Sequence, residues 1–246
     1  MRTLVLSDLH SNREATLAVL DAARSLAFER VIVLGDLVGY GADPNEVVEA
    51  VRGLRPFAVI RGNHDKVVAG VASAEDFNPV AAEAARINRL LLLPENSEYL
   101  SALPRGPETI GGAFAIAHGT PLDEDEYLVD EAGASHVFEK TVIPVCFFGH
   151  THVAGAVVLK EGAVNFLVPG KPEAVLRLEA GARYLINPGS VGQPRDSDPR
   201  ASFAIYDEDA GEVLFRRAEY PIERARQRIR EAGLPDILGE RLLWGA

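Results

Sequence analysis

The feature of this sequence that most limits its fold is a unit that recurs within the first 60 residues. An apolar run at 3–7 ends in a polar loop, and the following segment, 12–26, has apolar residues at helical spacing. The same order returns with the run 31–34, a glycine-rich loop and the segment 44–51, and a third apolar run occupies 57–60. Such alternation predicts parallel strands joined by right-handed helical crossovers, with the chemistry in loops at the carboxyl ends of the strands.

Residues that favour helix starts mark the helices of this half. Ser11 or Asn12 is the expected cap of the first helix and Asp43 that of the second, because their side-chain oxygens accept hydrogen bonds from free N–H groups. Two further amphipathic helices are expected at 78–93 and 95–103. The first half should therefore fold as parallel strands covered by helices.

The second half changes to short apolar runs separated by turn residues, with one predicted helix at 130–140 and a hairpin around Gly111 and Gly112. The predicted strands are 113–117, 142–148, 156–160, 163–168, 175–178, 183–186, 202–206 and 212–216. Their pairing is expected to be mainly antiparallel. Together the two halves predict an α/β (α+β) fold in which two mixed β-sheets pack as a sandwich flanked by helices.

The end of the chain, residues 217–246, is expected to be a helical tail. Residues 221–230 form a charged helix in this interpretation, and 234–244 carry an apolar set. That set packs either on the core or on a second subunit, so homo-oligomerisation through the tail is an open alternative. The length suits a single domain over residues 1–246.

Charge and hydropathy limit the partners. The 36 acidic and 25 basic residues give a net charge of -11, which opposes binding to nucleic acid because counterion release needs clustered cationic side chains. No apolar run approaches the ~18 residues that a membrane span needs, and no signal-peptide pattern is present. The one cysteine, Cys146, lies in an apolar run and allows no internal disulfide. We expect a cytoplasmic protein with a small-molecule substrate and no membrane partner.

The positions of the histidines are the strongest functional signal. Five of the six lie in short polar loops directly after predicted strands: His10, His64, His118, His150 and His152. The sixth, His136, falls on a predicted helix and is expected to be an ordinary helical residue. The same loops supply the oxygen donors Asp8, Asp36, Asn63 and Asp65. Imidazole mixed with oxygen donors is the ligand set that first-row divalent metals prefer.

The segment Asp8-Leu9-His10 places two donors two residues apart. On an extended backbone such residues point the same way, so both reach one cation while Leu9 turns into the core. The alternative is that Asp8 caps the following helix and His10 is a loop residue. After the next strand, Asp36 offers a carboxylate able to bridge two metals, although Gly-Asp by itself is a common turn.

Two other segments are harder to explain as turns. Gly62-Asn63-His64-Asp65 brings an amide oxygen, an imidazole and a carboxylate to one strand end. Gly149-His150-Thr151-His152 repeats the two-residue spacing with two imidazoles, which contribute little packing in a loop. His118, between Ala117 and Gly119, is a weak signal alone. Five loops that all present ligand types predict a metal site.

With these motifs in the family's order over about residues 1–207, the chain resembles the calcineurin-like metallophosphoesterases, particularly their small bacterial and archaeal phosphodiesterase branch. The resemblance implies two divalent metal ions. It assigns to the first metal the ligands Asp8, His10, Asp36 and His152, and to the second Asp36, Asn63, His118 and His150. It places His64 near the leaving group, as an acid or transition-state stabiliser.

The expected reaction is therefore hydrolysis of a phosphate ester. Two cations about 3.5 to 4 Å apart lower the pKa of a bridging water and hold the phosphoryl oxygens for in-line attack by the resulting hydroxide. Protonated His64 would donate to the leaving oxygen, with Asp65 orienting and charging it. Manganese is the expected metal, and iron, zinc, nickel and cobalt accept the same donors.

One departure from the family and two residues bear on the substrate. Protein Ser/Thr phosphatases of this superfamily carry an arginine after the Gly-Asp motif that grips the phosphate, whereas Tyr40 occupies the corresponding stretch here. The missing charge favours a phosphodiester over a dianionic monoester. Tyr40 either stacks on a leaving-group ring or packs as a turn residue. Arg195, beyond the expected rigid turn 187–192, either clamps a phosphate or pairs with Asp196 or Asp198.

Several functions remain in competition. Hydrolysis of small phosphodiesters or nucleotides is favoured, with a phosphomonoesterase or nucleotide phosphatase as a variant of the same chemistry. A nuclease would need a basic stripe, which the acidic balance argues against. A non-catalytic protein-binding scaffold of the same fold is a further alternative, against which the complete set of ligands argues.

Overall fold

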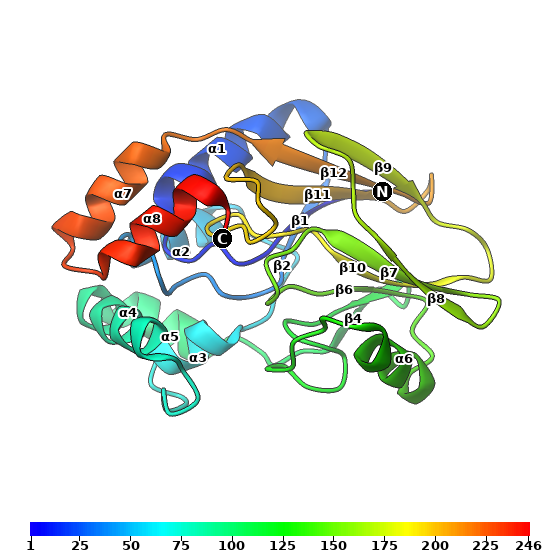
Figure 1. Cartoon of the computed structure of the whole chain (residues 1–246), viewed down its shortest axis with the longest axis horizontal. Helices are drawn as coiled ribbons and strands as arrows, with labels where there is room; N and C mark the ends of the chain where they lie inside the picture. Colours follow the sequence, from blue (N-terminus) through cyan, green and yellow to red (C-terminus); the bar gives the residue numbers. More distant parts are fainter.

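The computed structural model describes all 246 residues, and its framework is two six-stranded mixed β-sheets (Figure 1). The first sheet has the order β3 (Ala58–Val59), β2 (Arg30–Val33), β1 (Arg2–Leu6), β11 (Ala201–Asp207), β12 (Glu212–Ala218) and β9 (Glu173–Arg177). The second has the order β4 (Glu108–Ile110), β5 (Phe114–Ile116), β6 (Val145–Phe147), β10 (Arg183–Asn187), β7 (Gly155–Lys160) and β8 (Ala163–Leu167). The predicted fold class is confirmed.

Each sheet combines strands in a way that the sequence did not fully predict. β1, β2 and β3 are parallel as expected, but the other edge of β1 pairs antiparallel with β11, so strands of the second half complete the first sheet. In the second sheet β5, β6 and β10 are parallel, and the prediction of mainly antiparallel pairing is wrong for this trio. The connection from β5 to β6 contains the helix α6 (Glu131–Lys140), which provides the length that a parallel crossover requires.

The two sheets pack face to face around an apolar layer, and β1 shows how its residues are divided. Val5 belongs to the cluster between the sheets, together with Phe147 and Tyr206. Leu4 and Leu6 belong to the cluster on the opposite face, under the helices. A strand buried on both faces is apolar at every position, which explains why the first run of the sequence shows no alternation.

Helices cover the outer faces of the sheets (Figure 1). Most helices lie on the side of the first sheet, or at the end of that sheet where its parallel strands finish. They are α1 (Arg13–Ala23), continued by the 3₁₀ turn Arg24–Leu26, α2 (Pro44–Gly53), α3 (Asn63–Val68), α4 (Pro79–Leu91), α5 (Pro94–Ser101), α7 (Ile222–Glu231) and α8 (Asp236–Trp244). α6 packs on the second sheet, where its Val137 and Phe138 share a cluster with the buried Cys146.

The helix starts agree with the sequence in part. Asn12 caps α1, since its Oδ1 accepts a hydrogen bond from Ala15 N at 3.1 Å. Asp43 stands before α2 but does not cap it, because its carboxylate forms an ion pair with Arg228 of α7. α3 was not predicted: it begins at Asn63, inside a segment that was expected to be a loop.

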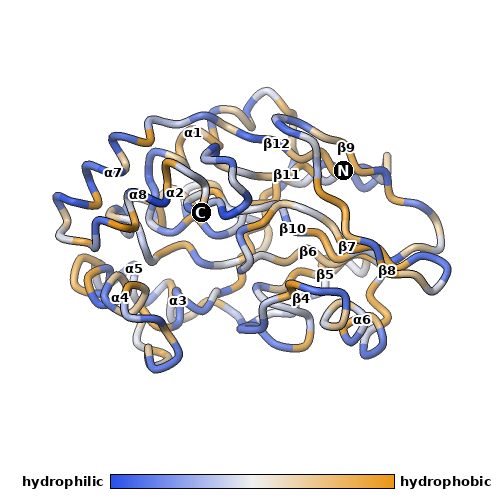
Figure 2. Tube along the Cα trace, in the orientation of Figure 1, coloured by the Kyte–Doolittle hydropathy of each residue, from blue (hydrophilic) through white to orange (hydrophobic).

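The tail packs on its own chain. Ile229 of α7 and Leu238 and Leu242 of α8 are buried in the same apolar cluster as Leu4 of β1. Figure 2 shows α7 as largely hydrophilic with recurring apolar residues, and Figure 1 shows both tail helices beside α1 and α2. Part of the apolar set of the tail therefore belongs to the core of this chain, whereas Ile237 and Trp244 are exposed to 45% and 71%. Self-association through the tail stays a prediction.

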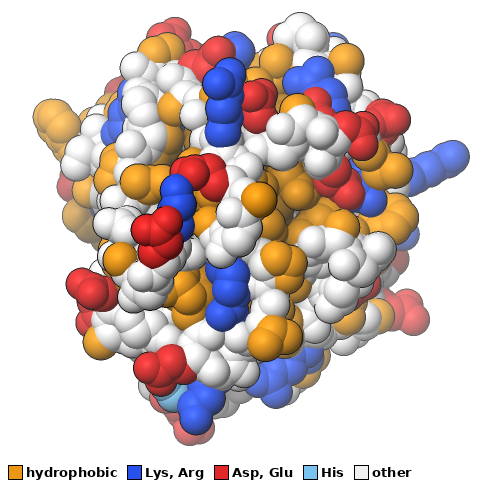
Figure 3. All heavy atoms as spheres, turned by 90° about the vertical axis from the view of Figure 1, so that its right-hand side faces the viewer, with side chains coloured by type: hydrophobic (Ala, Val, Ile, Leu, Met, Phe, Trp, Pro, Cys, Tyr) orange, Lys and Arg blue, Asp and Glu red, His pale blue; other side chains and the backbone are white.

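The opposite end of the molecule, around β8 and β9, exposes some apolar side chains. Val168 and Val175 are exposed to 79% and 52%, and Figure 3 shows that hydrophobic and charged side chains are interspersed over this face. No helix has the length and apolar character needed to cross a membrane.

Candidate metal centre

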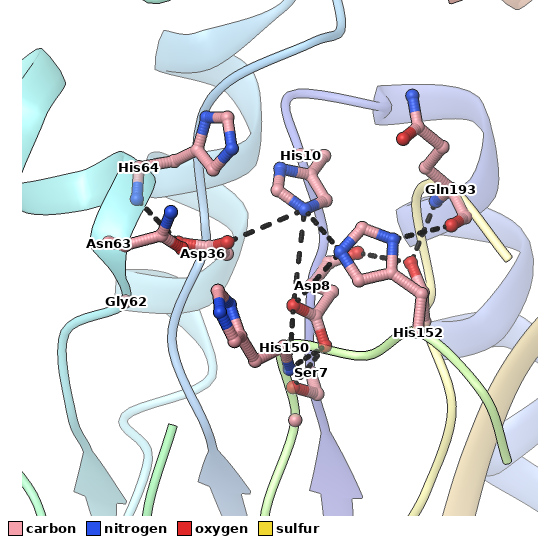
Figure 4. Close-up of polar contacts among 12 residues, drawn as sticks. Ser7, Asp8, His10, Asp36, Gly62, Asn63, His64, His150, His152 and Gln193 are labelled. Atoms are coloured by element: carbon pink, nitrogen blue, oxygen red, sulfur yellow. Dashed lines mark hydrogen bonds and ion pairs between the residues drawn. The ribbon is translucent and has the colours of Figure 1, made fainter. Parts of the chain in front are cut away.

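Polar loops at the carboxyl ends of five strands meet at one place (Figure 4). Asp8 and His10 follow β1, Asp36 follows β2, Asn63 and His64 begin α3 just after β3, His118 follows β5, and His150 and His152 follow β6. Parallel strands bring their carboxyl ends to one edge of a sheet, as the sequence argument assumed. We call the seven predicted ligands the ligand cluster: Asp8, His10, Asp36, Asn63, His118, His150 and His152. All except Asn63 are buried.

The first group within the ligand cluster consists of Asp8, His10, Asp36 and His152, whose ligand atoms lie within 4.8 Å of one another. His10 Nε2 is 3.0 Å from His152 Nε2 and 3.5 Å from Asp36 Oδ2. His152 Nε2 is 3.4 Å from Asp8 Oδ1. These are the four residues that the resemblance assigned to the first metal.

Backbone carbonyls fix the ring nitrogens that face away from this group. His10 Nδ1 lies 3.1 Å from Val38 O, and His152 Nδ1 lies 2.6 Å from Gln193 O. A carbonyl oxygen only accepts, so each Nδ1 donates its hydrogen and each Nε2 presents a lone pair. Burial lowers the pKa of both imidazoles well below the usual value, so both are neutral at pH 7. Two lone pairs therefore face each other, an arrangement that a cation stabilises.

The second group consists of Asp36, His118 and His150, with Asn63 beside it. His118 Nε2 is 3.4 Å from Asp36 Oδ2 and 3.3 Å from Asn63 Oδ1. His150 is oriented differently, because its Nε2 lies 3.1 Å from the carbonyl oxygen of Asp125. Its Nδ1 is therefore the nitrogen left to bind a cation. The composition of this group also follows the assignment made from the resemblance.

Asp36 belongs to both groups. Its Oδ2 faces His10 and His118, while its Oδ1 accepts a hydrogen bond from His64 N at 2.9 Å. Burial raises the pKa of Asp36, but His118, His64 and His10 together outweigh burial and hold that pKa well below its usual range. The shared carboxylate is thus ionised and stands between two sets of imidazoles, which is the position of a bridging ligand.

The backbone of the ligand loops differs from the extended conformation that the sequence argument assumed. Asp8, His10, Asp36, His150 and His152 have positive φ angles between 47° and 65°. Residues other than glycine in this region carry strain of order 1–3 kcal/mol each, and they cluster at functional sites. Asp8 and His10 do converge, but through left-handed turns and not through strand alternation.

Two glycines allow the loops to approach one another closely. A Cβ on Gly62 would collide with the Asp36 carboxylate, and one on Gly149 would collide with Ser7 Oγ. Both glycines directly precede predicted ligands in the sequence. Their role is therefore to leave space for a neighbouring ligand loop.

Two buried asparagines support the ligand loops: Asn88, which sequence reasoning did not single out, and Asn187, the first residue of the predicted rigid turn 187–192. Asn88 of α4 accepts a hydrogen bond from Gly39 N at 2.9 Å and donates one to Gly41 O at 2.9 Å. Asn187 donates to Gly149 O at 2.8 Å, which ties the turn after β10 to the loop after β6. A signal for Asn88 was present, because it is a polar residue on the apolar face of an amphipathic helix.

His64 lies at the edge of the cluster without joining it. Its ring centroid is 4.4 Å from that of Tyr40 and 4.5 Å from that of Phe77, and its Nδ1 is buried without a hydrogen-bond partner. Burial lowers the pKa of His64 to about 4, so the imidazole is neutral at pH 7. Donation by a protonated His64 to the leaving oxygen during the reaction stays a prediction.

Asp65 does not make the contact that was expected of it. Its carboxylate accepts hydrogen bonds from Gly62 N at 3.0 Å and from Val38 N at 3.2 Å, and no hydrogen bond joins it to the His64 ring. The unpredicted helix explains the difference, because a carboxylate at the third position of α3 turns back to the helix start. Asp65 therefore fixes the backbone that carries Asn63 and His64, and its predicted role in orienting His64 is wrong.

Arg195 reaches the cluster. Its guanidinium carbon lies 5.6 Å from the centre of the Tyr40 ring, and its Nε is buried without a hydrogen-bond partner. Asp196 and Asp198 pair with other arginines, so the ion-pair alternative for Arg195 is wrong. Tyr40 is 7% exposed and packs on His64, which places it at the site although it does not protrude from a turn.

A cleft of about 350 Å³ opens beside the second group. Its walls include the aromatic rings of Tyr40, Phe77 and Tyr127 together with His64 and His150. The Tyr127 ring stacks on the His150 ring at a centroid distance of 3.8 Å. Sequence reasoning missed Phe77 and Tyr127, because each lies in an irregular segment without periodicity or motif.

The donors present fit a pair of divalent cations. The imidazoles of His10, His150 and His152, an ionised shared carboxylate and an amide oxygen are ligands that first-row divalent metals accept. Burial lowers the pKa of His118, but Asp36 and Asp8 raise it to about 10, so this imidazole gives up a proton when it binds a metal. Thiolates are absent from the site, because the one cysteine is buried in β6. The site therefore indicates divalent metals bound through nitrogen and oxygen.

Several known proteins are similar to this chain in sequence and in fold. Residues 1–211 match the family model of the calcineurin-like phosphoesterase superfamily domain. The chain is 40% identical, over 98% of its length and 97% of the other, to an uncharacterized protein of Methanocaldococcus jannaschii. A crystal structure of a metallophosphoesterase from Sphaerobacter thermophilus is 41% identical, with a TM-score of 0.85 and coverage of 100% of this chain and 99% of that one.

A more distant structure has the same fold. The crystal structure of a hypothetical protein from Pyrococcus horikoshii OT3 is 21% identical, with a TM-score of 0.80 and coverage of 100% of this chain and 98% of that one. The family model ends at residue 211, whereas the full-length likenesses extend through the tail helices. The tail thus lies outside the part of the chain that the family model describes.

Proposed function

Because the chain belongs to the calcineurin-like phosphoesterase superfamily, whose members are hydrolases of phosphate esters, we propose that its ligand cluster holds two divalent metal ions and hydrolyses small phosphodiesters. The observation that carries this proposal is the approach of His10 Nε2 to His152 Nε2 at 3.0 Å with both lone pairs inward. Two lone pairs cannot form a hydrogen bond, so their approach supports the binding of a cation between them. Asp36 supplies the matching negative charge to both groups.

The protein's own groups prepare the site for this reaction. Two divalent ions, when bound, provide an activated water and neutralise the phosphoryl oxygens. Asp36 fixes the spacing of the two groups, and the Nδ1–H bonds of His10 and His152 hold their rings in one tautomer and one orientation. Near-complete burial of the ligands keeps bulk water away from the reacting phosphate.

His64 is the residue that we assign to the leaving oxygen. It lies between the ligand cluster and the cleft, and its ring packs edge-on against the His10 ring at a centroid distance of 5.0 Å. As a neutral imidazole it donates a hydrogen bond through its ring N–H. The negative charge of a bound phosphate raises the pKa of His64, which moves the imidazole toward the protonated form that acts as a general acid.

The charged groups around the expected position of the phosphate favour a phosphodiester as the substrate. Tyr40 fills the stretch where the related Ser/Thr phosphatases carry an arginine, and its ring packs on His10 and His64. Arg195, over the same ring, is the guanidinium that faces the first group, and its charge acts on Asp8. A single guanidinium suits the single negative charge of a phosphodiester better than the double charge of a monoester.

Manganese is our proposal for the metal, because mixed imidazole and carboxylate donors with an amide oxygen accept it readily. Iron, cobalt, nickel and zinc are the competing ions with the same donor preference. We propose the cytoplasm as the site of action, which is consistent with a single buried free thiol.

The direct test measures hydrolysis of bis(p-nitrophenyl) phosphate and p-nitrophenyl phosphate by protein that has been stripped with a chelator and resupplied with one metal at a time. We expect no turnover without metal, restoration with manganese at a stoichiometry of two per chain, and a higher kcat/KM for the diester. Metal content is measured by atomic emission on the same samples.

Each other outcome has a definite meaning. A higher kcat/KM for the monoester contradicts the diester assignment. Two bound metals without turnover on either ester point to a binding scaffold of the same fold. Binding of a single metal contradicts the role of Asp36 as a shared ligand.

A further inference from the structure

An irregular loop, 119–127, leaves the second group of the ligand cluster and returns to it. The loop begins directly after His118, the ligand that follows β5. Further along the same loop, the carbonyl oxygen of Asp125 lies 3.1 Å from His150 Nε2, and the Tyr127 ring stacks on the His150 ring at 3.8 Å. Two ligands of the second group are therefore attached to one segment, to which the sequence motifs assign no role.

Contacts within the loop make it compact. Thr120 N donates a hydrogen bond to Asp123 O at 2.8 Å, and Thr120 Oγ1 donates one to Glu126 Oε2 at 2.6 Å. A Cβ on Gly119 would collide with the carbonyl oxygens of Asp123 and Glu124, so the chain folds back closely on itself. The position of this compact loop then depends on the side chains that join it to the rest of the site.

Glu124 joins the loop to the segment that carries Asn63. Its carboxylate accepts hydrogen bonds from Arg61 Nε and Nη2, at 3.1 and 3.0 Å, and from Lys66 Nζ at 3.2 Å. Arg61 precedes Asn63 by two residues, and Lys66 follows it by three, within α3. Asn63 is a predicted ligand of the second group, so Glu124 connects it to the loop that carries the contacts of His150.

The Glu124 carboxylate is buried and ionised. Its side chain is 7% exposed, and Arg105 Nε lies 3.6 Å from it as a third cationic neighbour. Burial raises the pKa of Glu124, but the hydrogen bonds from Arg61 and Lys66 outweigh burial and hold that pKa below its usual value. A bidentate pair between arginine and carboxylate fixes orientation as well as distance. Loss of this buried charge would leave its cationic partners uncompensated and free the loop to move.

The first group is held in another way, since its imidazoles are oriented by Val38 O and Gln193 O. We propose that Glu124 is a positioning residue for the second metal ion, which holds Asn63 and His150 in place and does not act on the first. Groups that orient metal ligands from outside typically change metal affinity by about 10–100-fold. The inference rests on the proposed function for the presence of two metals, but not for hydrolysis.

The test measures manganese binding by calorimetry to protein that has been stripped with a chelator. In the otherwise unchanged protein, Glu124→Gln should weaken one of two binding events by about 10–100-fold and leave the other as it was. Two backgrounds then identify the event: His10→Ala removes a ligand of the first group, and Asn63→Ala removes one of the second. We expect Glu124→Gln to weaken binding in the His10→Ala background and to have no effect in the Asn63→Ala background.

Glu208→Gln is the matched control. Glu208 forms an ion pair with Arg30, also partly buried, at the ends of the strands that lie away from the site. Its loss removes the same charge and disturbs a comparable pair without touching the 119–127 loop, so we expect both manganese affinities to stay unchanged. Glu124→Asp keeps the charge on a shorter side chain and should restore part of the affinity. Melting temperatures of the two Gln variants separate an effect on the second metal from a general loss of stability.

The outcomes distinguish this inference from the proposed function. Equal weakening of both binding events, or no weakening of either, overturns the role of Glu124. Two bound metals of which one responds to Glu124→Gln, without hydrolysis of either p-nitrophenyl ester by the unchanged protein, support that role and contradict the proposed reaction. Hydrolysis of the diester by a two-metal protein whose affinities do not respond to Glu124→Gln leaves the proposed function standing and refutes the positioning role.

Discussion

The ligand cluster and the rim of the cleft lie side by side but are built in different ways. The cluster follows strand ends, is almost fully buried, and is fixed by backbone hydrogen bonds to its imidazoles. The rim, by which we mean Tyr40, Phe77, Tyr127 and Arg195, comes from loops. Tyr127 is half exposed, and the Arg195 guanidinium has no acidic partner.

The difference assigns separate tasks to the two regions. Ligands for two cations must be held within a few tenths of an ångström, which strand ends and strained loops achieve. Substrate preference needs only side chains that reach the cleft, and loops supply these without disturbing the sheets. Substitutions in the cluster should therefore abolish turnover, while substitutions at the rim should change KM or the choice of substrate.

The largest effect is expected for Asp36→Asn. An amide keeps the size of the side chain but removes the charge that both groups share, and its nitrogen cannot bind a cation. We expect a fall in kcat of more than about 10⁴-fold, beyond what loss of a general acid causes, with fewer than two metals bound per chain. The control is Asp130→Asn, at the exposed start of α6, which should keep both metals and full turnover. Two tightly bound metals in Asp36→Asn would contradict the assignment of metal binding to the cluster and of substrate preference to the rim.

His64→Ala tests the boundary between the two regions. Because His64 lies outside both donor groups, its loss should lower kcat by about 10²–10⁴-fold while two metals remain bound. The measurement pairs steady-state kinetics with metal analysis of the same preparation. His136→Ala, an exposed helical histidine, is the matched control and should behave as the unchanged protein. A loss of bound metal that accompanies the fall in kcat would show that His64 belongs to the ligand cluster.

The cluster could be predicted from the sequence because local patterns encode it. Short apolar runs followed by donors at Asp8, Asp36 and His118 identify strand ends, and topology then brings those ends together. Positive φ angles at the ligands could not be predicted, because residues such as His150 and His152 adopt them only under the constraint of neighbouring loops. The structure does bring these residues together with the other predicted ligands, although the assumed extended backbone was wrong.

The rim could not be predicted, because it depends on contacts between segments far apart in the chain. Phe77 and Tyr127 carry no motif, and they line the cleft from two irregular segments far apart in the chain. The role of Asp65 was mistaken for a related reason, since the short helix α3 has too few residues to show helical periodicity. The antiparallel pairing of β1 with β11 could not be predicted either. The two strands are separated by about two hundred residues, and no local sequence pattern identifies them as partners.

Gly62→Ala tests whether the cluster depends on close backbone approach. A Cβ at this position collides with the Asp36 carboxylate, so the loops must separate, at a cost of about 1–3 kcal/mol in stability. We expect a lower melting temperature and a fall in kcat of about tenfold, smaller than for loss of His64 because all donors remain. Gly53→Ala is the control, because nothing lies within 4 Å of its Cβ and it ends α2. Unchanged kcat in a destabilised Gly62→Ala protein would show that the cluster tolerates movement.

The smallest effect is expected at the rim, for Phe77→Leu. The Phe77 ring is half-buried against His64 and forms a wall of the cleft, so it is placed to contact an aromatic leaving group. Replacing an aromatic contact by an aliphatic one costs about 0.5–1.5 kcal/mol, which is roughly a two- to tenfold rise in KM for bis(p-nitrophenyl) phosphate. Phe57→Leu is the matched control, because Phe57 is 60% exposed and does not line the cleft. A fall in kcat with KM unchanged would instead mean that Phe77 positions the His64 imidazole, and Phe77 would then act with the catalytic machinery and not with the substrate-binding rim.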